Sequence, residues 1–433
     1  MCEILNMANQ YYLPRISDSV LDDYLQARGA VLIQGPKWCG KTTTAEQKSK
    51  SCVYFSDPKK KQLLKDLLTL NYEEVINGPT PRLFDEWQLA PELWDIVRFE
   101  VDHRKQMGQF ILTGSTVPPK SDLISHSGVG RIAKMTMRTM SLYESGDSNG
   151  KVSLQDLFEG KSIACSCDSK LSEIAYLCCR GGWPSTVNLA QKAALNQSKL
   201  YIEEIISSDI SEIDGLIKDQ ERAKKLLKSY SRNIASQATL ETIRQDIIGA
   251  DIDTTFSQNT LYTYLNALTS LFVIEDAPAW NPNLRSKIAI RSTPTRYFVD
   301  PAIATASLGI GPKDLEKDKN TFGLIFENLC VRDLRIYSQL LSGTVYHYRD
   351  NTSLECDCVI HLDNGKYGLI EVKLGSLRAI NEGAKNLIAL KNKIDDSKMG
   401  KPSFLMILTA VGDYAYKRPE DGIYIVPITC LKP

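Results

Sequence analysis

Residues 35–42 combine glycine, lysine and threonine at a spacing that binds phosphate. They read GPKWCGKT, which fits the pattern GxxxxGK[ST]. Gly35 and Gly40 let the backbone curl so that consecutive N–H groups point inward, and a helix starting there adds the partial positive charge of its N-terminus. Lys41 can reach the β and γ phosphates of a nucleotide, and the Thr42 hydroxyl suits Mg²⁺. The segment therefore predicts a site for ATP and Mg²⁺.

Two acids in series predict the rest of this site. Asp85 and Glu86 follow the apolar pair LF at 83–84. Asp85 would hold Mg²⁺ through water, and Glu86 would act as general base on the attacking water. The next strand candidate ends in Thr-Gly-Ser at Ser115, where a polar group would sense the γ-phosphate; an ordinary strand-to-loop turn is the alternative. The predicted nucleotide-binding residues are Gly35, Pro36, Lys37, Trp38, Cys39, Gly40, Lys41, Thr42, Thr43, Asp85 and Ser115, with Thr42 and Asp85 as metal ligands.

An arginine is expected near the transferring phosphoryl group, because a guanidinium stabilises the charge that develops there. Arg131, in the sequence GVGRIA, is the first candidate and Arg138 the second. The Ser/Gly-rich stretch before Arg131 would let it reach its own phosphate or that of a neighbouring copy in a homo-oligomer. An ordinary surface arginine is the alternative.

A second constellation of charged residues lies near the C-terminus. Asp357 lies in the strand candidate LECDCVIHL, and Glu371 and Lys373 lie in the next one, YGLIEVKLG. Residues two apart on a strand face the same way, so the acid followed by Glu-x-Lys matches the PD-(D/E)xK nuclease pattern. Asp357 and Glu371 would bind Mg²⁺ or Mn²⁺, helped by the Val372 carbonyl, and Lys373 would act on the attacking water beside a phosphodiester.

Alternatives to this nuclease reading stay open. A salt-bridged pair of strands produces the same pattern, and the domain could instead only bind nucleic acid or serve as a scaffold. Glu327, in the preceding helix, matches the extra acid that many such folds carry. Cys356 and Cys358 depart from the aromatic and aliphatic residues expected beside the aspartate.

Alternating strands and helices predict the elements that position the N-terminal site. The run AVLIQ at 30–34 predicts a buried parallel strand directly before the glycine-rich loop. Further strands are expected around Tyr54, Phe84 and Leu112, with amphipathic helices between them. This order indicates an α/β domain with a parallel sheet, which we place at residues 1–140.

The remainder of the chain divides into three expected domains. Residues 141–220 are expected to form a mainly helical lid, interrupted by RGGWP at 180–184. Residues 221–310 show three helix candidates and a hairpin, which is the winged-helix order. Residues 311–433 show a helix, three strands, a helix and further strands, which predicts a second α/β domain of the PD-(D/E)xK-like kind.

Composition excludes several classes of protein. The 433 residues contain 52 Lys and Arg against 52 Asp and Glu, so any DNA or RNA binding must be local rather than driven by net charge. The 11 Cys and 4 His lack the spacings of zinc sites, so we expect reduced structural thiols. No leader pattern or apolar run of membrane length is present, so we expect a cytoplasmic protein without a membrane partner.

The motifs in combination resemble a known family. GPKWCGKTTT, LFDEWQ, FILTGS, GRIAKMTMRTMSLYES and RGGWP, with the opening YLPRI, are similar to the prokaryotic AAA-type ATPases whose C-terminal half is a restriction-endonuclease-like domain. The resemblance implies an ASCE-type P-loop ATPase with Asp85 and Glu86 as the Walker B pair. It also implies that RGGWP lies near the adenine; a tight turn that buries its tryptophan is the alternative. The leading hypothesis is an Mg-dependent ATPase coupled to a nuclease-like domain, in DNA processing or defence. The alternative is a nucleotide-controlled switch whose other domains only bind nucleic acid or protein partners.

Overall fold

The computed structural model describes residues 12–114, 128–210, 219–250, 256–282 and 292–433. The chain divides into two compact units. The first unit comprises residues up to 139 together with 270–272, and the second comprises 140–269 and 273–433.

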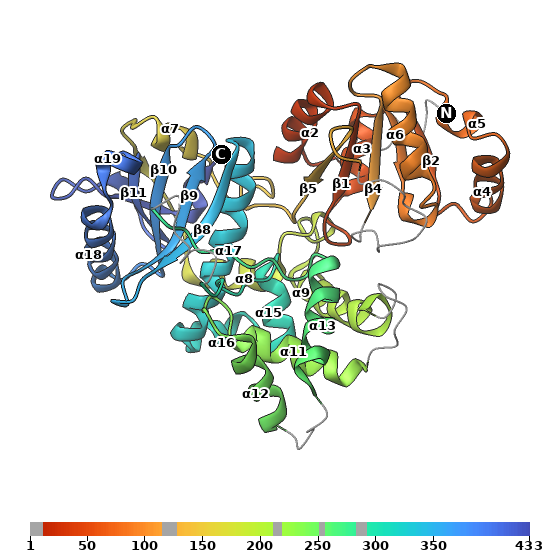
Figure 1. Cartoon of the computed structure of the whole chain (residues 1–433). Coiled ribbons are helices and arrows are strands. Elements are labelled where there is room, and N and C mark those ends of the chain that lie inside the picture. The colour runs from red at the N-terminus through yellow and green to blue at the C-terminus, as the bar shows by residue number, and fades with distance from the viewer. Residues whose placement is uncertain (1–11, 115–127, 211–218, 251–255, 283–291) are drawn as a thin grey trace. The chain divides into compact units, whose positions relative to one another are not determined.

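The first unit is a five-stranded parallel sheet with helices packed on it (Figure 1). The strand order is β2-β3-β4-β1-β5, and all neighbours are parallel. Its strands are β1 (Ala30–Gln34), β2 (Ser51–Tyr54), β3 (Arg82–Asp85), β4 (Phe110–Gly114) and β5 (Ile132–Thr136). Its helices are α2 (Ile16–Ala27), α3 (Lys41–Lys48), α4 (Lys61–Leu70), α5 (Glu73–Ile76), the 3₁₀ turn η1 (Trp87–Leu89) and α6 (Leu93–Arg104).

Burial of the central strand explains why the apolar runs predicted this sheet. Helices α2, α3 and α6 all pack on β1. Ala30, Val31, Leu32 and Ile33 are all buried, as expected for a parallel strand covered on both faces. Strand β4 lies between β1 and β3, so the segments that follow these three strands meet at one edge of the sheet.

The second unit contains a seven-stranded mixed sheet in the order β7-β12-β13-β11-β10-β9-β8. Its strands are β7 (Ala164–Ser166), β8 (Gly343–Arg349), β9 (Glu355–Leu362), β10 (Tyr367–Lys373), β11 (Phe404–Thr409), β12 (Tyr414–Lys417) and β13 (Tyr424–Pro427). Strands β10, β11 and β13 are parallel, whereas the outer pairs are antiparallel. Helices α17 (Lys319–Leu340) and α18 (Leu377–Lys393) pack on it, followed by α19 (Asp396–Met399).

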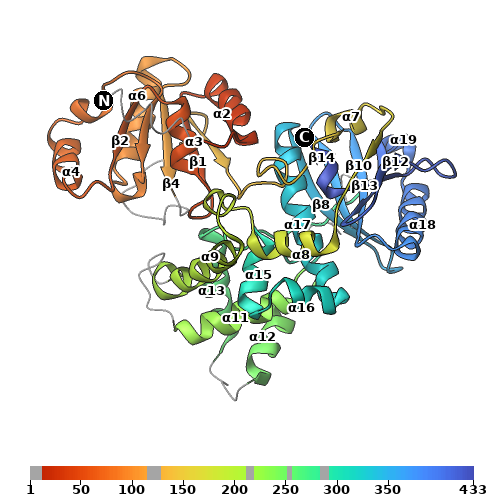
Figure 2. The same ribbon diagram turned by 180° about the vertical axis from the view of Figure 1, so that it is seen from behind.

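A helical part completes the second unit (Figures 1 and 2). It contains α8 (Leu171–Arg180), η2 (Pro184–Thr186), α9 (Gln191–Glu204), the π-helical turn η3 (Ile205–Asp209), α11 (Gln220–Arg232), α12 (Leu240–Ala250), α13 (Gln258–Ser270), α15 (Pro301–Leu308) and α16 (Pro312–Lys317). After α13, the isolated antiparallel bridges Ile274–Phe298 and Ala277–Thr295 follow. This order agrees with three helices and a hairpin, and the winged-helix assignment stays a prediction.

The structure differs from the sequence expectation at residues 141–170, which do not form a mainly helical lid. Strand β6 (Val152–Ser153) pairs with β14 (Leu431–Lys432), and β7 extends the seven-stranded sheet through β12. Only the short helix α7 (Leu154–Phe158) lies between β6 and β7. The partner strands lie about 250 residues further along the chain, so no local pattern could reveal them. Strand β14, which follows the 3₁₀ turn η4 (Ile428–Cys430), can be seen in Figure 2.

Across the described ranges, no helix is both long and apolar enough to cross a membrane.

Candidate functional site: a phosphate loop and a carboxylate–lysine cluster

The phosphate loop connects β1 to α3 through a backbone that only glycine can follow. Gly35 has a φ of +153°, and a Cβ there would lie 2.0 Å from the backbone oxygen of Met137. Gly40 has a φ of +98° and directly precedes the first residue of α3. The backbone conformation of the loop therefore requires glycine at both positions of the motif.

The loop already holds its lysine in place. Lys41 is buried, and its Nζ donates hydrogen bonds to the carbonyl oxygens of Gly35 at 2.9 Å and Pro36 at 2.7 Å. These bonds keep the ammonium at the mouth of the loop. An ammonium at this position can exchange the two carbonyls for the oxygens of a bound phosphate.

Asp85 is the point where three predicted parts of the site meet. Its Oδ1 accepts hydrogen bonds from the hydroxyls of Thr42 at 2.7 Å and Thr113 at 2.6 Å. Asp85 is buried at the end of β3, and Thr113 lies on β4 between the two other strands. A carboxylate and a hydroxyl offer hard oxygen ligands of the kind that Mg²⁺ takes, so Asp85 and Thr42 fit the ion.

Glu86 lies beside this pair in a left-handed conformation with a φ of +53°. Gln88 Nε2 donates a hydrogen bond to its Oε2. Burial raises the pKa of Glu86, and the charge of Asp85 acts in the same direction while Gln88 opposes it. A carboxylate with a raised pKa is a stronger base than an exposed one.

The other predicted residues of the loop occupy different environments. Trp38 is 37% exposed and Thr43 is exposed, whereas Pro36 and Cys39 are buried and Lys37 is half-buried. The Cys39 thiol donates to the Met137 oxygen at 3.7 Å. Ser115 lies outside the described residues.

Arg131 lies at the edge of the sheet away from the phosphate loop. Its backbone oxygen accepts from the N–H of Ala30, the first residue of β1, whereas the loop follows the last residue of that strand. A five-residue strand spans roughly 13 Å, so Arg131 and the loop lie at opposite ends of β1. Its guanidinium donates to Asp102 at 2.9 Å. The structure therefore does not bring Arg131 to the nucleotide site of its own chain, and action on a neighbouring copy stays a prediction.

Two residues of this site carry a weaker sequence signal. The sequence assigned Arg15 no role beyond its place in the motif YLPRI. Its buried guanidinium donates to the backbone oxygens of Cys39 at 2.7 Å and Arg138 at 2.9 Å. The second-choice arginine, Arg138, thus lies at the same edge as the phosphate loop. Thr113 was expected only as part of a strand end, and no local pattern distinguishes it from Ser115.

The C-terminal constellation forms a compact cluster on β9 and β10. Asp357 Oδ2 accepts from the backbone N–H of Val372 at 2.7 Å, which fixes it beside β10. Lys373 Nζ lies 3.2 Å from Asp357 Oδ2 and 2.6 Å from Glu371 Oε2. Glu327 on α17 accepts a 2.5 Å hydrogen bond from the Tyr297 hydroxyl. The structure thus brings the two predicted carboxylates and the lysine together.

Burial governs the electrostatics of this cluster. Burial raises the pKa of Glu371 to about 8, the charge of Asp357 adds to the shift, and Lys373 opposes it. Burial and Asp357 also raise the pKa of Glu327. For Lys373, burial lowers the pKa, but Asp357 and Glu371 outweigh it and the net shift is upward. The ammonium is therefore the charge that balances the carboxylates.

A divalent cation can be tested against the same groups. Glu371 Oε1 is buried and has no hydrogen-bond partner within the described part of the chain. In those ranges, no three His, Cys, Asp or Glu side chains are grouped as a metal site. Mg²⁺ nevertheless commonly uses one or two carboxylates, with water and substrate phosphate as the other ligands. Asp357 and Glu371 fit that mode of binding.

The remaining features around this cluster are structural. A Cβ on Gly383 of α18 would lie 3.3 Å from Lys373 Cε, so this glycine leaves space for the lysine. Cys356 is buried, and its thiol donates to the backbone oxygens of Cys358 and Ile370 at 3.3 Å each. The two cysteines that depart from the nuclease pattern therefore fill the core beside Asp357.

The RGGWP segment forms a tight turn. Gly181 has a φ of +73°, and the Gly182 N–H donates to Asp300 Oδ2 at 2.9 Å. Trp183 is fully buried, with its ring centroid 4.8 Å from that of Tyr201. A fully buried indole has no free face for an adenine, so the tight-turn alternative describes this segment.

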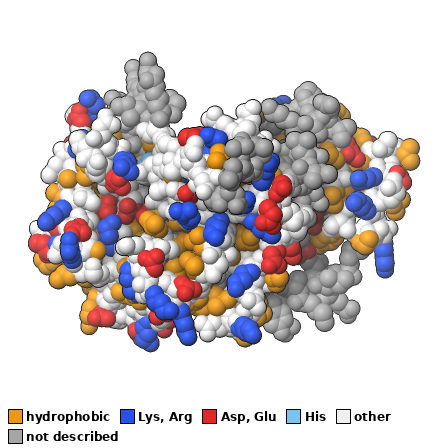
Figure 3. Space-filling view, turned by 90° about the horizontal axis from the view of Figure 1, so that it is seen from below, with side chains coloured by type: hydrophobic (Ala, Val, Ile, Leu, Met, Phe, Trp, Pro, Cys, Tyr) orange, Lys and Arg blue, Asp and Glu red, His pale blue; other side chains and the backbone are white. Residues whose placement is uncertain are grey.

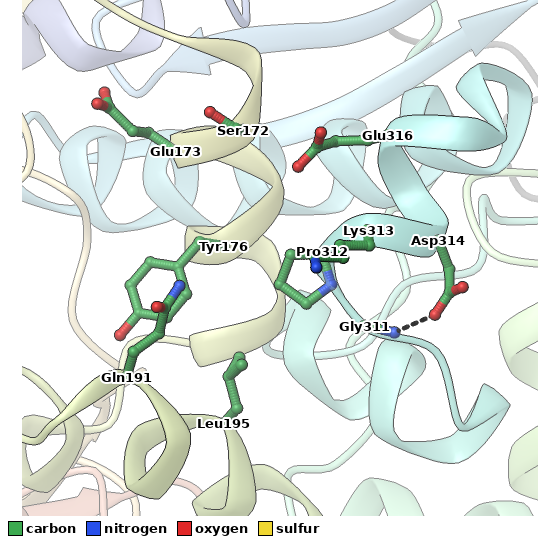
Figure 4. Close-up of a pocket in the computed structure, with 10 residues that line it drawn as sticks. All are labelled: Ser172, Glu173, Tyr176, Gln191, Leu195, Gly311, Pro312, Lys313, Asp314 and Glu316. Carbon is green, nitrogen blue, oxygen red and sulfur yellow. Dashed lines mark hydrogen bonds between the residues drawn. The ribbon is translucent and has the colours of Figure 1, made fainter.

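The second unit also contains a pocket of about 550 Å³ between α8, α9 and α16. In Figure 4, Tyr176 and Gln191 lie close together on one side, while Pro312 and Lys313 face α8 from the other. Asp314 is turned back to cap α16 by accepting from the Gly311 N–H at 2.9 Å. The residues that line this pocket include none of the predicted site residues.

Comparisons with known proteins divide the chain into three matched regions. Residues 27–145 match a family model described as an AAA domain. Residues 171–314 and 322–431 match models described as domains of unknown function, DUF8612 and DUF4143.

Relatives and solved structures give more distant likenesses. The uncharacterized proteins Rv2008c of Mycobacterium tuberculosis and Mb2031c of Mycobacterium bovis are each 23% identical over 368 residues, covering 83% of this chain and 73% of the relative. The Walker-type ATPase PABY2304 of Pyrococcus abyssi is 13% identical with a TM-score of 0.41, covering 68% of this chain and 96% of that one. An AMPPCP-bound DnaA from Aquifex aeolicus is 12% identical with a TM-score of 0.29, covering 58% and 90%.

The matched AAA region and the geometry of the loop agree. Residues 27–145 include the phosphate loop, the Asp85–Glu86 pair and β5. Lys41 and Thr42 begin the helix that follows the loop, and the Thr42 hydroxyl donates to Asp85 at one edge of the parallel sheet. The first unit is therefore an ATP-binding P-loop ATPase domain of the AAA type.

Proposed function

We propose that the protein hydrolyses ATP with Mg²⁺ in its first unit. The observation that carries the proposal is the convergence of Thr42 and Thr113 on Asp85 Oδ1, beside the general-base candidate Glu86. Thr42 and Asp85 would hold the ion, which neutralises charge on the phosphates when bound. Lys41 binds the β and γ phosphates, and Glu86 takes a proton from the attacking water.

One oxygen of the general-base candidate is engaged in a hydrogen bond, because Gln88 Nε2 donates to Glu86 Oε2. The other oxygen, Oε1, would accept the proton from the attacking water. On nucleotide binding, Lys41 would exchange its two loop carbonyls for phosphate oxygens.

We further propose that the C-terminal domain cleaves phosphodiester bonds in nucleic acid. Support comes from the contact of Lys373 with two carboxylates, of which Glu371 has a buried unpartnered oxygen. Asp357 and Glu371 would hold a divalent cation, which supplies Lewis-acid stabilisation of phosphate charge when bound. Lys373 would then be released to orient the attacking water.

Charge distribution bears on how nucleic acid would bind. On the face seen in Figure 3, Lys and Arg side chains are interspersed with Asp and Glu rather than separated from them. This agrees with equal numbers of cationic and anionic residues in the chain. Binding would depend on a few local phosphate contacts and would weaken with salt in proportion to their number.

A second function is favoured by one specific observation. The ammonium of Lys373 contacts one oxygen of each carboxylate, as it would in a purely structural ion-pair cluster. The domain would then only bind nucleic acid or protein, and the ATPase would act as a nucleotide-controlled switch.

The deciding experiment measures ATP turnover and strand cleavage in the same preparation. Phosphate release is followed with Mg²⁺, with and without DNA or RNA, and the nucleic acid is recovered to score cleavage. Stimulated turnover with cleavage supports the coupled enzyme. Turnover that ignores nucleic acid, together with intact strands in Mg²⁺ and in Mn²⁺, favours the switch.

A further inference from the structure

Strand β11 places a threonine beside the cluster of Asp357, Glu371 and Lys373. Thr409, the last residue of β11, is paired with Lys373, the last residue of β10. Two residues earlier, Ile407 is paired with Glu371, and the two strands are parallel. Thr409 is therefore the direct neighbour of Lys373 across the sheet.

The side chains of these paired residues face helix α18. A Cβ on Gly383 of α18 would lie 3.3 Å from Lys373 Cε and 3.4 Å from Glu371 Cβ. The same Cβ would lie 3.6 Å from Ile407 Cδ1. All three side chains thus lie on the face of the sheet against which α18 packs, whose elements are labelled in Figure 1. Residues two apart on a strand face the same way, so Thr409 lies on this face as well.

Two buried oxygen atoms on this face have no hydrogen-bond partner among the residues that the structure describes. They are Thr409 Oγ1 and Glu371 Oε1. Thr409 is 0% exposed and Glu371 is 1% exposed. Buried polar atoms are nearly always hydrogen-bonded, because losing water without gaining a new partner costs free energy. Two such atoms on neighbouring strands indicate a small polar ligand between them.

The ammonium of Lys373 serves other oxygens. Its Nζ lies 2.6 Å from Glu371 Oε2 and 3.2 Å from Asp357 Oδ2. The lysine therefore binds the opposite oxygen of the Glu371 carboxylate. Glu371 Oε1 and Thr409 Oγ1 stay available to a ligand that approaches from the side of β11.

The spacing of the strands limits the size of this ligand. Neighbouring strands lie about 4.8 Å apart and two residues rise about 6.6 Å, so the Cα atoms of Glu371 and Thr409 lie roughly 8 Å apart. The glutamate side chain and one water molecule can span that distance. Gly412 leaves room beside the hydroxyl, since a Cβ there would lie 3.7 Å from Thr409 Oγ1.

We propose that Thr409 is a positioning residue whose hydroxyl holds a water molecule beside the divalent cation of Asp357 and Glu371. The inference rests on the cation site of the proposed nuclease function. Mg²⁺ keeps several waters when protein carboxylates bind it. Thr409 Oγ1 accepts a hydrogen bond from one of these waters, while Glu371 Oε1 binds the cation. Both unpartnered oxygens then have partners, and the hydroxyl fixes the orientation of the water.

The test compares Thr409→Val with Thr409→Ser. Valine keeps the branched shape and removes the hydroxyl, whereas serine keeps the hydroxyl. Mn²⁺ binding to the full chain is measured by calorimetry without nucleotide, and the binding that is lost in Glu371→Gln is assigned to the cluster. Removing a group that hydrogen-bonds to a metal ligand commonly costs about 10–100-fold in metal affinity, so we expect a loss of this size in Thr409→Val. Thr409→Ser is expected to stay close to the parent affinity.

Thermal unfolding of the metal-free protein separates this role from a structural one. The Thr409 hydroxyl has no protein partner to lose, so the unfolding midpoint of Thr409→Val is expected to equal or exceed that of the parent. Added Mn²⁺ should raise the midpoint of the parent more than that of Thr409→Val. Thr305→Val is the matched control, because the buried Thr305 hydroxyl donates to the Ala302 oxygen at 3.1 Å. That variant should lower the midpoint and leave Mn²⁺ affinity unchanged.

Cleavage of nucleic acid is scored separately, so that the two proposals can fail independently. Mn²⁺ that binds at the cluster and depends on Thr409, with no strand cut, would sustain the inference and remove the nuclease activity. Parent Mn²⁺ affinity in Thr409→Val would overturn the inference. It would also be overturned by equal Mn²⁺ binding in the parent and Glu371→Gln, because no cation would then be held at the cluster. A metal-free Thr409→Val that unfolds at a clearly lower temperature, or does not fold, would give the hydroxyl a structural role instead.

Discussion

The guanidinium of Arg15 donates a 2.7 Å hydrogen bond to the backbone oxygen of Cys39, inside the phosphate loop. Its second terminal nitrogen donates to the oxygen of Arg138, beyond the end of β5. One buried side chain thus fixes the position of the phosphate loop relative to the segment that follows β5. We interpret Arg15 as a residue that positions the loop without touching the nucleotide.

Arg15→Met keeps the aliphatic stem and removes both hydrogen bonds. Buried hydrogen bonds from a charged donor contribute about 1.5–3 kcal/mol each, so we expect ATP to bind at least about tenfold more weakly. Titration calorimetry measures the change. Arg28→Met is the control, because the exposed Arg28 guanidinium donates to the adjacent Ala27 oxygen and not to the phosphate loop. Equal affinity in the two variants would remove Arg15 from the site.

Lys41→Ala is expected to abolish measurable ATP binding. It removes the cation that the loop holds between the Gly35 and Pro36 oxygens. We expect a loss on the order of 100-fold or more in affinity, measured with a fluorescent ATP analogue. Lys48→Ala on the same helix is the control, since Lys48 pairs with Asp22. Hydrolysis by Lys41→Ala at the parent rate would contradict the phosphate-loop assignment.

Glu86→Gln is expected to bind ATP normally and to lose turnover. The carboxamide keeps the shape of the side chain and cannot accept the proton, which costs about 10²–10⁴-fold in rate for a general base. Phosphate release and nucleotide affinity are measured together. Glu46→Gln, which alters a carboxylate bonded to the Tyr54 hydroxyl in the same unit, should keep the parent rate. Parallel losses in both variants would point to a general effect on folding.

Arg131→Ala tests whether a neighbouring copy completes the site. We expect near-normal binding and slower turnover, because the guanidinium would act mainly in the transition state. Mixing this variant with Glu86→Gln should then restore part of the activity, since some interfaces would combine an intact base with an intact arginine. Asp102→Asn serves as the control for the Arg131–Asp102 ion pair. Unchanged turnover in Arg131→Ala would leave the arginine a purely structural role.

Glu371→Ala and Lys373→Ala are each expected to abolish cleavage of nucleic acid while ATP hydrolysis continues. The residues of the two sites belong to separate compact units, so the losses should be independent. Removing divalent metal with a chelator should stop cleavage in the parent protein. Lys366→Ala, an exposed lysine before β10, is the matched control. Cleavage that persists in Glu371→Ala would indicate a contaminant or another site.

The residues of the phosphate loop were predictable because they are contiguous. The pattern from Gly35 to Thr42 needs a strand before it and a helix after it, and both are encoded by the adjacent residues. The C-terminal cluster was predictable for a related reason. Asp357 and Glu371 lie on strands joined by a short turn, so their pairing depends on local chain geometry.

Other parts of the sites depended on contacts between distant segments. The strand order alone places Thr113 against Asp85, and the helix before β1 alone brings Arg15 to Cys39. The same parallel register places Arg131 at the edge of the sheet opposite the loop. The Ser/Gly-rich stretch before it had suggested that Arg131 could reach the phosphate of its own chain or that of a neighbouring copy.

The sequence by itself predicted the residues of both candidate sites and the order of most strands and helices, because backbone periodicity and loop motifs are local properties of the chain. Tertiary structure alone decided that β6 and β7, within residues 141–170, pair with strands near the C-terminus and that the Arg15 guanidinium reaches Cys39 and Arg138. Such contacts form between segments that are separated in the sequence. They are selected by the burial and hydrogen bonding of the whole folded unit, which no window of sequence contains.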